Sequence, residues 1–253
     1  MIWAAGVFAF ILGAVIGSFL NVLIYRIPRD QSVVFPPSAC GACGARLGWR
    51  DLFPVVSYVL LRGRCRNCGA AISPRYPLVE VLSGLGFLAI YLKYGLTVGG
   101  LAAAVLFSLL LAIIFIDLDF LIIPNRLVLA GLILGVPLVM LQSFELLLSG
   151  LLGLAVGGGL LLLTAVVSRG GMGGGDIKLA AMIGLYLGWP QILLMLFISF
   201  LLGAIVGLGL VALRRKKMKE AVPFGPFIAV ATYIVMFWGP SILNWYTNTS
   251  LWG

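Results

Sequence analysis

Residues 98–120 read VGGLAAAVLFSLLLAIIFIDLDF, and this stretch decides the kind of fold. From Val98 to Ile116 it contains no charged residue, and Asp117 and Asp119 follow at once. A helix of about 20 apolar residues crosses the hydrocarbon core of a bilayer. The stretch therefore predicts a transmembrane helix that ends in carboxylates.

Further apolar segments on both sides of this one set the class of the protein. Apolar residues make up 62% of the chain and charged residues 10%, whereas a soluble domain is about half apolar and roughly a quarter charged. We therefore predict an all-α polytopic membrane protein of about eight transmembrane helices, with the lipid bilayer as its main partner and one small loop domain. The predicted spans are Ile2–Ile24, Leu78–Leu92, Val98–Ile116, Leu127–Leu141, Leu146–Val167, Leu179–Leu187, Ile192–Leu213 and Val222–Trp245.

The basic residues are unevenly distributed, and their positions predict the topology. Eight arginines lie between residues 25 and 77, and five more basic residues lie at 214–219. Cytoplasmic loops carry an excess of lysine and arginine, so both termini of an eight-span chain are expected outside the cytoplasm. Only Lys93 of the 17 basic residues then falls on the outer side. The same rule explains the net charge of +9, and no nucleic acid is expected as a partner.

Three parts of the chain follow from these segments. Residues 1–24 are predicted to form the first transmembrane helix, residues 25–77 a cytoplasmic loop with four cysteines, and residues 78–253 a membrane domain of seven helices. The two aspartates of the opening stretch belong to the third part. The cysteines and the carboxylates are therefore expected to serve separate purposes.

The loop contains two C-x-x-C pairs, Cys40 with Cys43 and Cys65 with Cys68, and 21 residues separate them. A glycine follows each pair, which is the pattern of two zinc knuckles whose four thiolates complete a closed tetrahedral site. Two disulfides or four free thiols are the alternatives, and a cytoplasmic location argues against disulfides. We expect a structural Zn²⁺ that folds a loop too small to have its own core.

Three of the eight acidic residues, Asp117, Asp119 and Asp176, lie at the ends of predicted spans. A carboxylate at the edge of a membrane span is costly to bury and usually marks function. The predicted topology puts Asp117 and Asp176 on the same cytoplasmic face. Carboxylates far apart in sequence are therefore expected at one membrane depth.

Asp176 follows the glycine-rich segment GGMGGG of residues 170–175. Glycine permits positive φ and very close approach of another backbone. Three interpretations are open: a flexible loop, a phosphate-binding loop that lacks its usual preceding strand, and a segment against which a substrate backbone lies. The second carboxylate on the same face favours the third, with Gly173, Gly175 and Lys178 close to the substrate.

The chain contains no histidine, so hydrolysis would depend on carboxylates, cysteine, lysine or a metal. Two carboxylates in one site cannot easily both ionise, so one stays protonated near neutral pH. Such a pair activates water and protonates the leaving amine, as in aspartic proteases. We expect Asp176 and one of the two aspartates that end the opening stretch, Asp117 or Asp119, to cut a peptide bond in this way. The alternatives are an ion- or proton-coupled transporter that uses the same aspartates and a structural membrane module.

The same motifs resemble those of a known family, the type IV prepilin peptidases, which are GxGD-type membrane aspartic proteases. Asp117 stands seven residues before Pro124 in an Ile-Pro-Asn motif, and Asp176 stands in a G-x-G-D-x-K motif. Other segments that fit the family are residues 17–28, the paired C-x-x-C loop, residues 73–80 and residues 223–227.

This resemblance implies an activity, substrates and a location. It implies catalysis by Asp117 and Asp176, with Asp119 at a variable position, and cleavage of the basic leader of prepilins or pseudopilins after its glycine. It also implies a bacterial inner membrane protein with periplasmic termini. Family members with the cysteine loop usually methylate the new N-terminal amine, so S-adenosylmethionine is expected as methyl donor by resemblance alone, with no binding residues assigned.

Overall fold

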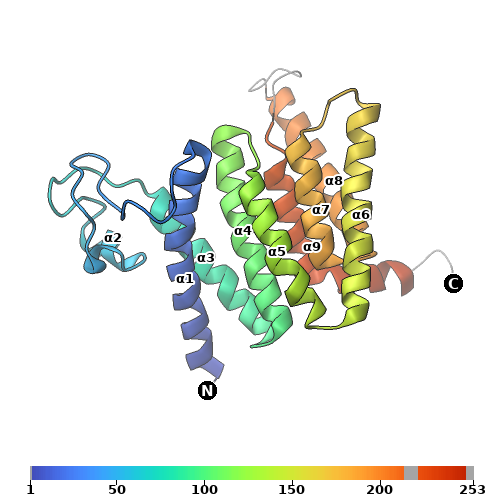
Figure 1. Cartoon of the computed structure of the whole chain (residues 1–253), viewed down its shortest axis with the longest axis horizontal. Helices are drawn as coiled ribbons and strands as arrows, with labels where there is room; N and C mark the ends of the chain where they lie inside the picture. The colour runs from blue at the N-terminus through green and yellow to red at the C-terminus, as the bar shows by residue number, and fades with distance from the viewer. Residues whose placement is uncertain (1, 214–221, 249–253) are drawn as a thin grey trace. The chain divides into compact units, whose positions relative to one another are not determined.

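The computed structural model describes residues 2–213 and 222–248 (Figure 1). The described chain forms two compact units, which divide after Gly100. Some of the basic residues behind the predicted topology lie outside the described residues, namely Arg214, Arg215, Lys216, Lys217 and Lys219.

In the described ranges, eight helices of at least 14 residues correspond to the eight predicted spans, and the prediction of an all-α polytopic membrane protein is confirmed. By length and composition, six of them can cross a membrane, and α5 is a shorter apolar helix. Within the described ranges there is no β-strand, and the two isolated β-bridges lie in the cysteine loop. The long helices are α1 (Ile2–Arg26), α3 (Arg75–Tyr94), α4 (Val98–Phe120), α5 (Asn125–Met140), α6 (Phe144–Val167), α7 (Gly174–Leu187), α8 (Gln191–Ala212) and α9 (Gly225–Asn248).

In the first unit, α1 packs closely against α3 (Figure 1). A Cβ built on Gly17 would lie 2.8 Å from both the Glu80 Cα and the Ser83 Cβ, so a side chain here would separate the two helices. The side-chain amide of Asn21 donates a hydrogen bond of 3.1 Å to the Tyr76 carbonyl. The connection between the two helices contains only the short helices η1 (Ile27–Arg29), η2 (Trp49–Asp51) and α2 (Val56–Leu60).

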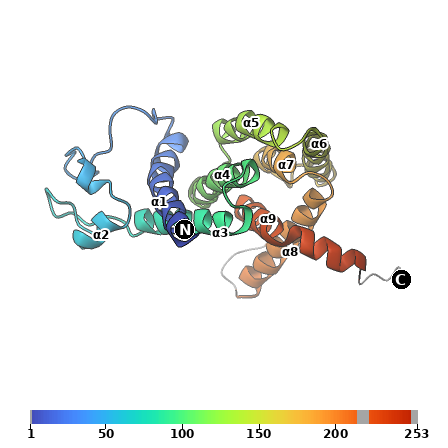
Figure 2. The ribbon, with the colours of Figure 1, turned by 90° about the horizontal axis from the view of Figure 1, so that it is seen from below.

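In the second unit, α7 is the central helix. It contacts α5, α6, α8 and α9, and Figure 2 shows it enclosed by its neighbours. The side chains of Leu179, Met182, Ile183 and Leu185 are fully buried. The contacts of α7 with four neighbouring helices therefore position its first turn.

A row of glycines on α6 brings its backbone against α7. A Cβ built on Gly150, Gly153 or Gly157 would collide with carbonyl oxygens of α7. Helices in membranes associate through such small-residue contacts, because lipid supplies no hydrophobic drive between them. This close contact explains why so short a helix is held firmly.

Helix α7 begins earlier than predicted. The sixth span was expected from Leu179, but the helix starts at Gly174 and includes Asp176 in its first turn. Glycine is a poor helix former, and the burial of the following turns outweighs that preference. The glycine-rich segment is therefore a loop only up to its helix-capping residue, Gly173.

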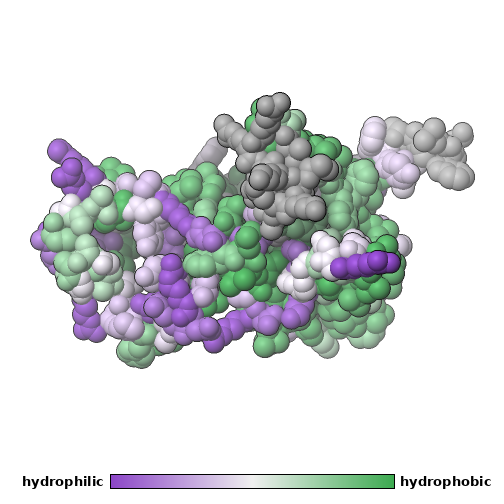
Figure 3. Space-filling model, turned by 90° about the horizontal axis from the view of Figure 1, so that it is seen from above, coloured by the Kyte–Doolittle hydropathy of each residue, from purple (hydrophilic) through white to green (hydrophobic). Residues whose placement is uncertain are grey.

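Large apolar side chains remain exposed on the outer surface of the second unit. Leu162, Phe197 and Leu208 are each more than half exposed, and hydrophobic residues spread over the helical bundle in Figure 3. Soluble monomers rarely leave wide apolar surfaces to water. The surface suits contact with lipid chains.

Candidate active site

Asp117 lies in the last turn of α4, and its side chain is only 5% exposed. The backbone N–H of Gly225, the first residue of α9, donates a hydrogen bond of 3.0 Å to Asp117 Oδ2. By contrast, Asp119 is exposed. The start of α9 therefore holds the Asp117 carboxylate in the interior, whereas Asp119 lies at the surface.

Asp176 lies in the first turn of α7, three residues after Gly173, whose backbone amide stabilises the carboxylate. The charge of Asp117 acts on the Asp176 carboxylate. A like charge has this effect only when it is close. The structure thus brings together the two carboxylates that the sequence singled out.

Ile123, in the connection between α4 and α5, lies between the first turns of α7 and α9. A Cβ built on Gly175 would lie 3.0 Å from the Ile123 Cβ. A Cβ built on Gly225 would lie 3.4 Å from the Ile123 Cδ1 and 2.7 Å from Asp117 Oδ2. Glycine at both positions allows α7 and α9 to close around the carboxylates.

Lys178 lies one residue beyond the first turn of α7, and its ammonium group donates a hydrogen bond of 3.1 Å to Asn125 Oδ1. Asn125 is the first residue of α5 and directly follows Pro124. The bond joins the two motifs that surround the aspartates in sequence. Lys178 is exposed, so its charge remains available on the surface beside the site.

Gly225 was not among the site residues predicted from the sequence. Its contact with Asp117 joins residues 108 positions apart, and no local pattern reports such a contact. The available signal was the segment Pro223–Phe227, in which a glycine between two prolines marks a helix start. That signal indicates an element boundary and does not say what the boundary contacts.

The four cysteines of the loop come together as predicted. The Sγ atoms of Cys40, Cys43, Cys65 and Cys68 all lie within 4.8 Å of one another, and none forms a disulfide. The Sγ atoms of Cys40 and Cys68 are 3.9 Å apart, whereas four thiolates around one Zn²⁺ at about 2.3 Å would be about 3.8 Å apart. This donor set fits a closed tetrahedral metal site.

The two C-x-x-C segments have the same local structure. In the first, the Gly44 N–H donates to the Cys40 carbonyl over 2.9 Å, and Gly44 has a φ of +70°. In the second, the Gly69 N–H donates to the Cys65 carbonyl over 2.9 Å, and Gly69 has a φ of +72°. Glycine adopts this left-handed conformation without strain. The repeated turn places both thiols of each pair on one side.

Backbone amides also prepare the first knuckle for a metal. The N–H groups of Cys43 and Ala42 lower the pKa of the Cys40 thiol to about 6. A thiol must lose its proton before it binds a metal ion. The amides of this turn therefore favour the thiolate form of Cys40, whereas the pKa of the Cys68 thiol in the second knuckle is raised to about 11.

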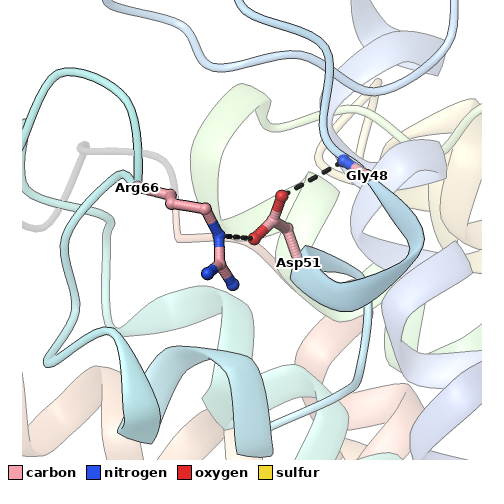
Figure 4. A network of polar contacts seen from close by, with 3 residues as sticks. All are labelled: Gly48, Asp51 and Arg66. Atoms are coloured by element: carbon pink, nitrogen blue, oxygen red, sulfur yellow. Dashed lines mark hydrogen bonds and ion pairs between the residues drawn. The ribbon is translucent and has the colours of Figure 1, made fainter.

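Asp51 connects the segment between the knuckles with the second knuckle, as Figure 4 shows. Its Oδ1 forms an ion pair of 2.8 Å with Arg66 Nε, and its Oδ2 accepts a hydrogen bond of 3.1 Å from the Gly48 N–H. The Arg66 guanidinium lowers the pKa of the Asp51 carboxyl. Asp51 thus helps to hold Cys65 and Cys68 against the preceding segment.

Comparison with known proteins finds two matching family models. The model described as "Bacterial Peptidase A24 N-terminal domain" matches residues 11–94, and the model described as "Type IV leader peptidase family" matches residues 104–208. The first of these ranges includes all four cysteines, and the second includes both aspartates. No solved structure matches the chain.

Curated relatives match along most of the chain and share the name "Prepilin leader peptidase/N-methyltransferase". The relative from Aeromonas hydrophila is 36% identical over 279 residues, which cover 98% of this chain and 96% of the relative. The relative from Bacillus subtilis (strain 168) is 34% identical over 242 residues, which cover 96% of this chain and 98% of the relative. The relative from Myxococcus xanthus (strain DK1622) is 42% identical over 207 residues, which cover 80% of this chain and 62% of the relative.

Proposed function

The chain belongs to the type IV leader peptidase family, and we propose that Asp117 and Asp176 are its catalytic pair. The pair cleaves the basic leader of a prepilin or pseudopilin after the leader's glycine. The observation that carries this proposal is the placement of two carboxylates from different helices around Ile123: Asp117 through its hydrogen bond with Gly225, and Asp176 in the turn that contains Gly175. No feature of the described residues favours the alternative of an ion-coupled transporter.

The two carboxyl groups divide the work of acid and base. One stays protonated while the other is ionised, because ionisation of both would place like charges side by side. The ionised carboxylate takes a proton from water, and the resulting oxygen nucleophile attacks the scissile carbonyl. The protonated carboxyl stabilises the carbonyl oxygen by a hydrogen bond, and a proton then passes to the leaving amine. The pair titrates as a unit.

The glycine-rich segment is proposed to lie next to the substrate. A Cβ built on Gly174 would meet no atom within 4 Å, so this side of the first turn is open. An extended substrate backbone could therefore approach Asp176 with little obstruction from side chains. A prepilin helix must unwind there, because a helical backbone offers no free carbonyl for attack.

We further propose that the four cysteines bind one structural Zn²⁺. Their spacing, common turn geometry and short Sγ distances support zinc over disulfides or free thiols. A site closed by four thiolates leaves no position for water. Zinc is therefore assigned to the folding of residues 25–77 and takes no part in cleavage.

The relatives' names include an N-methyltransferase, and we propose the same second activity here. S-adenosylmethionine would supply the methyl group to the amine that cleavage exposes. No residue is assigned to its binding. The methylated product is the pilin that has already lost its leader, so cleavage comes first.

The proposed location is the bacterial inner membrane, with both termini on the periplasmic side. The Arg-rich loop at residues 25–77 supports this orientation through the positive-inside rule. A prepilin leader is basic as well and would stay in the cytoplasm for the same reason. The bond to be cut would then lie at the cytoplasmic interface, the same face as the proposed catalytic pair.

Incubation of the purified protein with a leader-bearing pilin, with and without S-adenosylmethionine, tests the proposal. Mass spectrometry should show a product that starts directly after the leader glycine. With S-adenosylmethionine the product should be heavier by one methyl group. An intact pilin in both reactions, together with ion flux into proteoliposomes, would favour the transporter instead.

A further inference from the structure

The loop of the first unit exposes a cluster of large apolar side chains that neither the carboxylates nor the cysteines explain. We call it the α2 patch, and it consists of Trp49, Leu52, Phe53, Val56, Val59 and Leu60. Each of these side chains is between 45% and 77% exposed. Six such residues within twelve positions expose an apolar surface of a kind that soluble monomers rarely leave to water.

The α2 patch is tied to a membrane-spanning helix at a defined depth. The backbone N–H of Val55, directly before α2, donates a hydrogen bond of 2.7 Å to Glu80 Oε2. Glu80 is the sixth residue of α3, so it lies about 7.5 Å along the helix from Arg75. Since α3 has the 20 residues that a bilayer core needs, this level lies within about 7.5 Å of the edge of the core, the depth that interfacial segments reach.

The attachment at Val55 is firm. Val55 has a φ of +61°, a conformation that β-branched residues rarely adopt. Such a conformation persists only where the surroundings impose it. Glu80 provides this constraint, because its side chain is only 8% exposed and also hydrogen-bonds with Ser18 of α1. The loop is therefore anchored to both helices of the hairpin.

The charges around the patch match the surface of an anionic membrane. Between residues 27 and 74 the chain carries six arginines and two aspartates, and one of the aspartates pairs with Arg66. The Arg50 guanidinium lies 5.2 Å from the Trp49 ring centroid. Aromatic rings beside basic groups are typical of segments at the boundary between lipid head groups and acyl chains.

We propose that the α2 patch inserts into the cytoplasmic leaflet of the bilayer and holds the cysteine loop on the membrane surface. The occupant of the patch is lipid, with anionic head groups next to the arginines. The depth set by Glu80, the exposed apolar side chains and the excess of arginine all favour the same surface. The loop then lies flat on the interface and does not extend into the cytoplasm.

Fluorescence quenching in nanodiscs tests this proposal. The full-length protein would be placed in nanodiscs of phosphatidylcholine and phosphatidylglycerol whose acyl chains are brominated near the head group. The Trp49 signal is the difference between the parent protein and its Trp49→Phe variant. We expect the bromolipid to quench this signal and aqueous iodide to leave it largely unchanged.

Matched variants show whether the patch itself makes the contact. Val59→Asp, at a side chain 65% exposed, should reduce the bromolipid quenching of Trp49. Val34→Asp, at a loop side chain 68% exposed outside the patch, should leave it unchanged. Equal loss in both variants would overturn the proposal. Zinc content and leader cleavage in detergent show whether Val59→Asp folds.

The parent protein decides the question even if Val59→Asp does not fold. Quenching of Trp49 by iodide without quenching by bromolipid would mean that the patch faces water. Protection from both quenchers would mean that protein covers it, either another part of the chain or a second copy. Each of these two results would overturn the assignment to lipid.

Discussion

At the scale of single residues, the contact between Gly225 and Asp117 makes a sharp prediction. A Cβ at position 225 would lie 2.7 Å from Asp117 Oδ2, so Gly225→Ala must displace the carboxylate. A shift of about 1 Å in a catalytic group lowers the rate about 100-fold. We expect a loss of kcat of this size for leader cleavage, measured under saturating substrate.

The control for this variant is Gly159→Ala in α6. A Cβ at position 159 meets no atom within 4 Å, so the same substitution changes helix propensity without a collision. This control should cleave the leader at the rate of the parent. Equal rates in the Gly225→Ala variant and the control would remove Gly225 from the site.

The shared site of Asp117 and Asp176 predicts the pH dependence of cleavage. A carboxyl group with a raised pKa keeps its proton to higher pH, so the acid member of the pair is lost as the pH rises through that value. Because two close carboxylates cannot easily both ionise, we expect kcat/KM to fall with an apparent pKa above the value near 4 of an isolated aspartate. A cleavage rate that does not change between about pH 5 and pH 8 would contradict the shared-proton mechanism.

Gly175 shows how the structure can give a glycine a role that the sequence does not suggest. The sequence suggested that it leaves room for the substrate. In the structure its missing side chain faces Ile123, which gives the glycine a packing reason within the protein. The direction of a Cβ depends on the tertiary arrangement and is not visible in the sequence. Gly174 has the open side that the substrate role requires.

At the scale of elements, the glycine row of α6 predicts where the second unit is sensitive to added volume. Gly153→Val would force α6 away from α7, because the Cβ collides with the Gly184 carbonyl oxygen. Overpacking of this kind costs about 1–3 kcal/mol. We expect lower thermal stability and reduced cleavage, since α7 carries Asp176.

Gly159→Val is the matched comparison, because position 159 on the same helix is exposed. Its thermal stability in detergent should stay close to that of the parent. A Gly153→Val protein as stable as Gly159→Val would show that the contact between α6 and α7 is not tight. The comparison separates packing from the general effect of valine in a helix.

The cysteine loop predicts a metal content. The parent protein should contain about one zinc per chain, because four thiolates complete one site. Cys40→Ser or Cys68→Ser should lose the zinc and expose the loop to protease, with methylation failing before cleavage. Elemental analysis combined with limited proteolysis provides the measurement. A gently purified parent protein without zinc would rule out the site.

Secondary structure was largely predictable at this scale, and helix ends were less so. The predicted span Leu78–Leu92 became α3 (Arg75–Tyr94), because apolar runs report burial and a helix continues beyond its apolar part. The start of α7 was missed for a related reason. Glycine signals a loop locally, whereas the packing of the helix decides its first turn.

At the scale of the whole molecule, the sequence predicted the all-α membrane class and the grouping of the four cysteines. Apolar length and the uneven distribution of arginine are properties of the chain that do not depend on packing. The contact of Asp117 with Gly225 and the attachment of Val55 to Glu80 are of another kind. They join positions that are far apart in the chain, and a single sequence does not indicate which distant residues are in contact.

The central claim is that two aspartates in one site cut the leader, and a single set of assays tests it most directly. Purified parent, Asp117→Asn, Asp176→Asn and Asp119→Asn proteins would be incubated with the same leader-bearing pilin. Each of the first two substitutions should lower cleavage by roughly 10⁴-fold or more, because members of a cooperating catalytic unit are individually essential.

The exposed Asp119 provides the matched control. Asp119→Asn removes the same charge two residues away from Asp117 and should retain substantial activity. Circular dichroism would show that all four proteins keep the same helix content. Loss of cleavage in Asp117→Asn and Asp176→Asn alone is the predicted result, and full activity in either of these two variants would contradict the two-aspartate site.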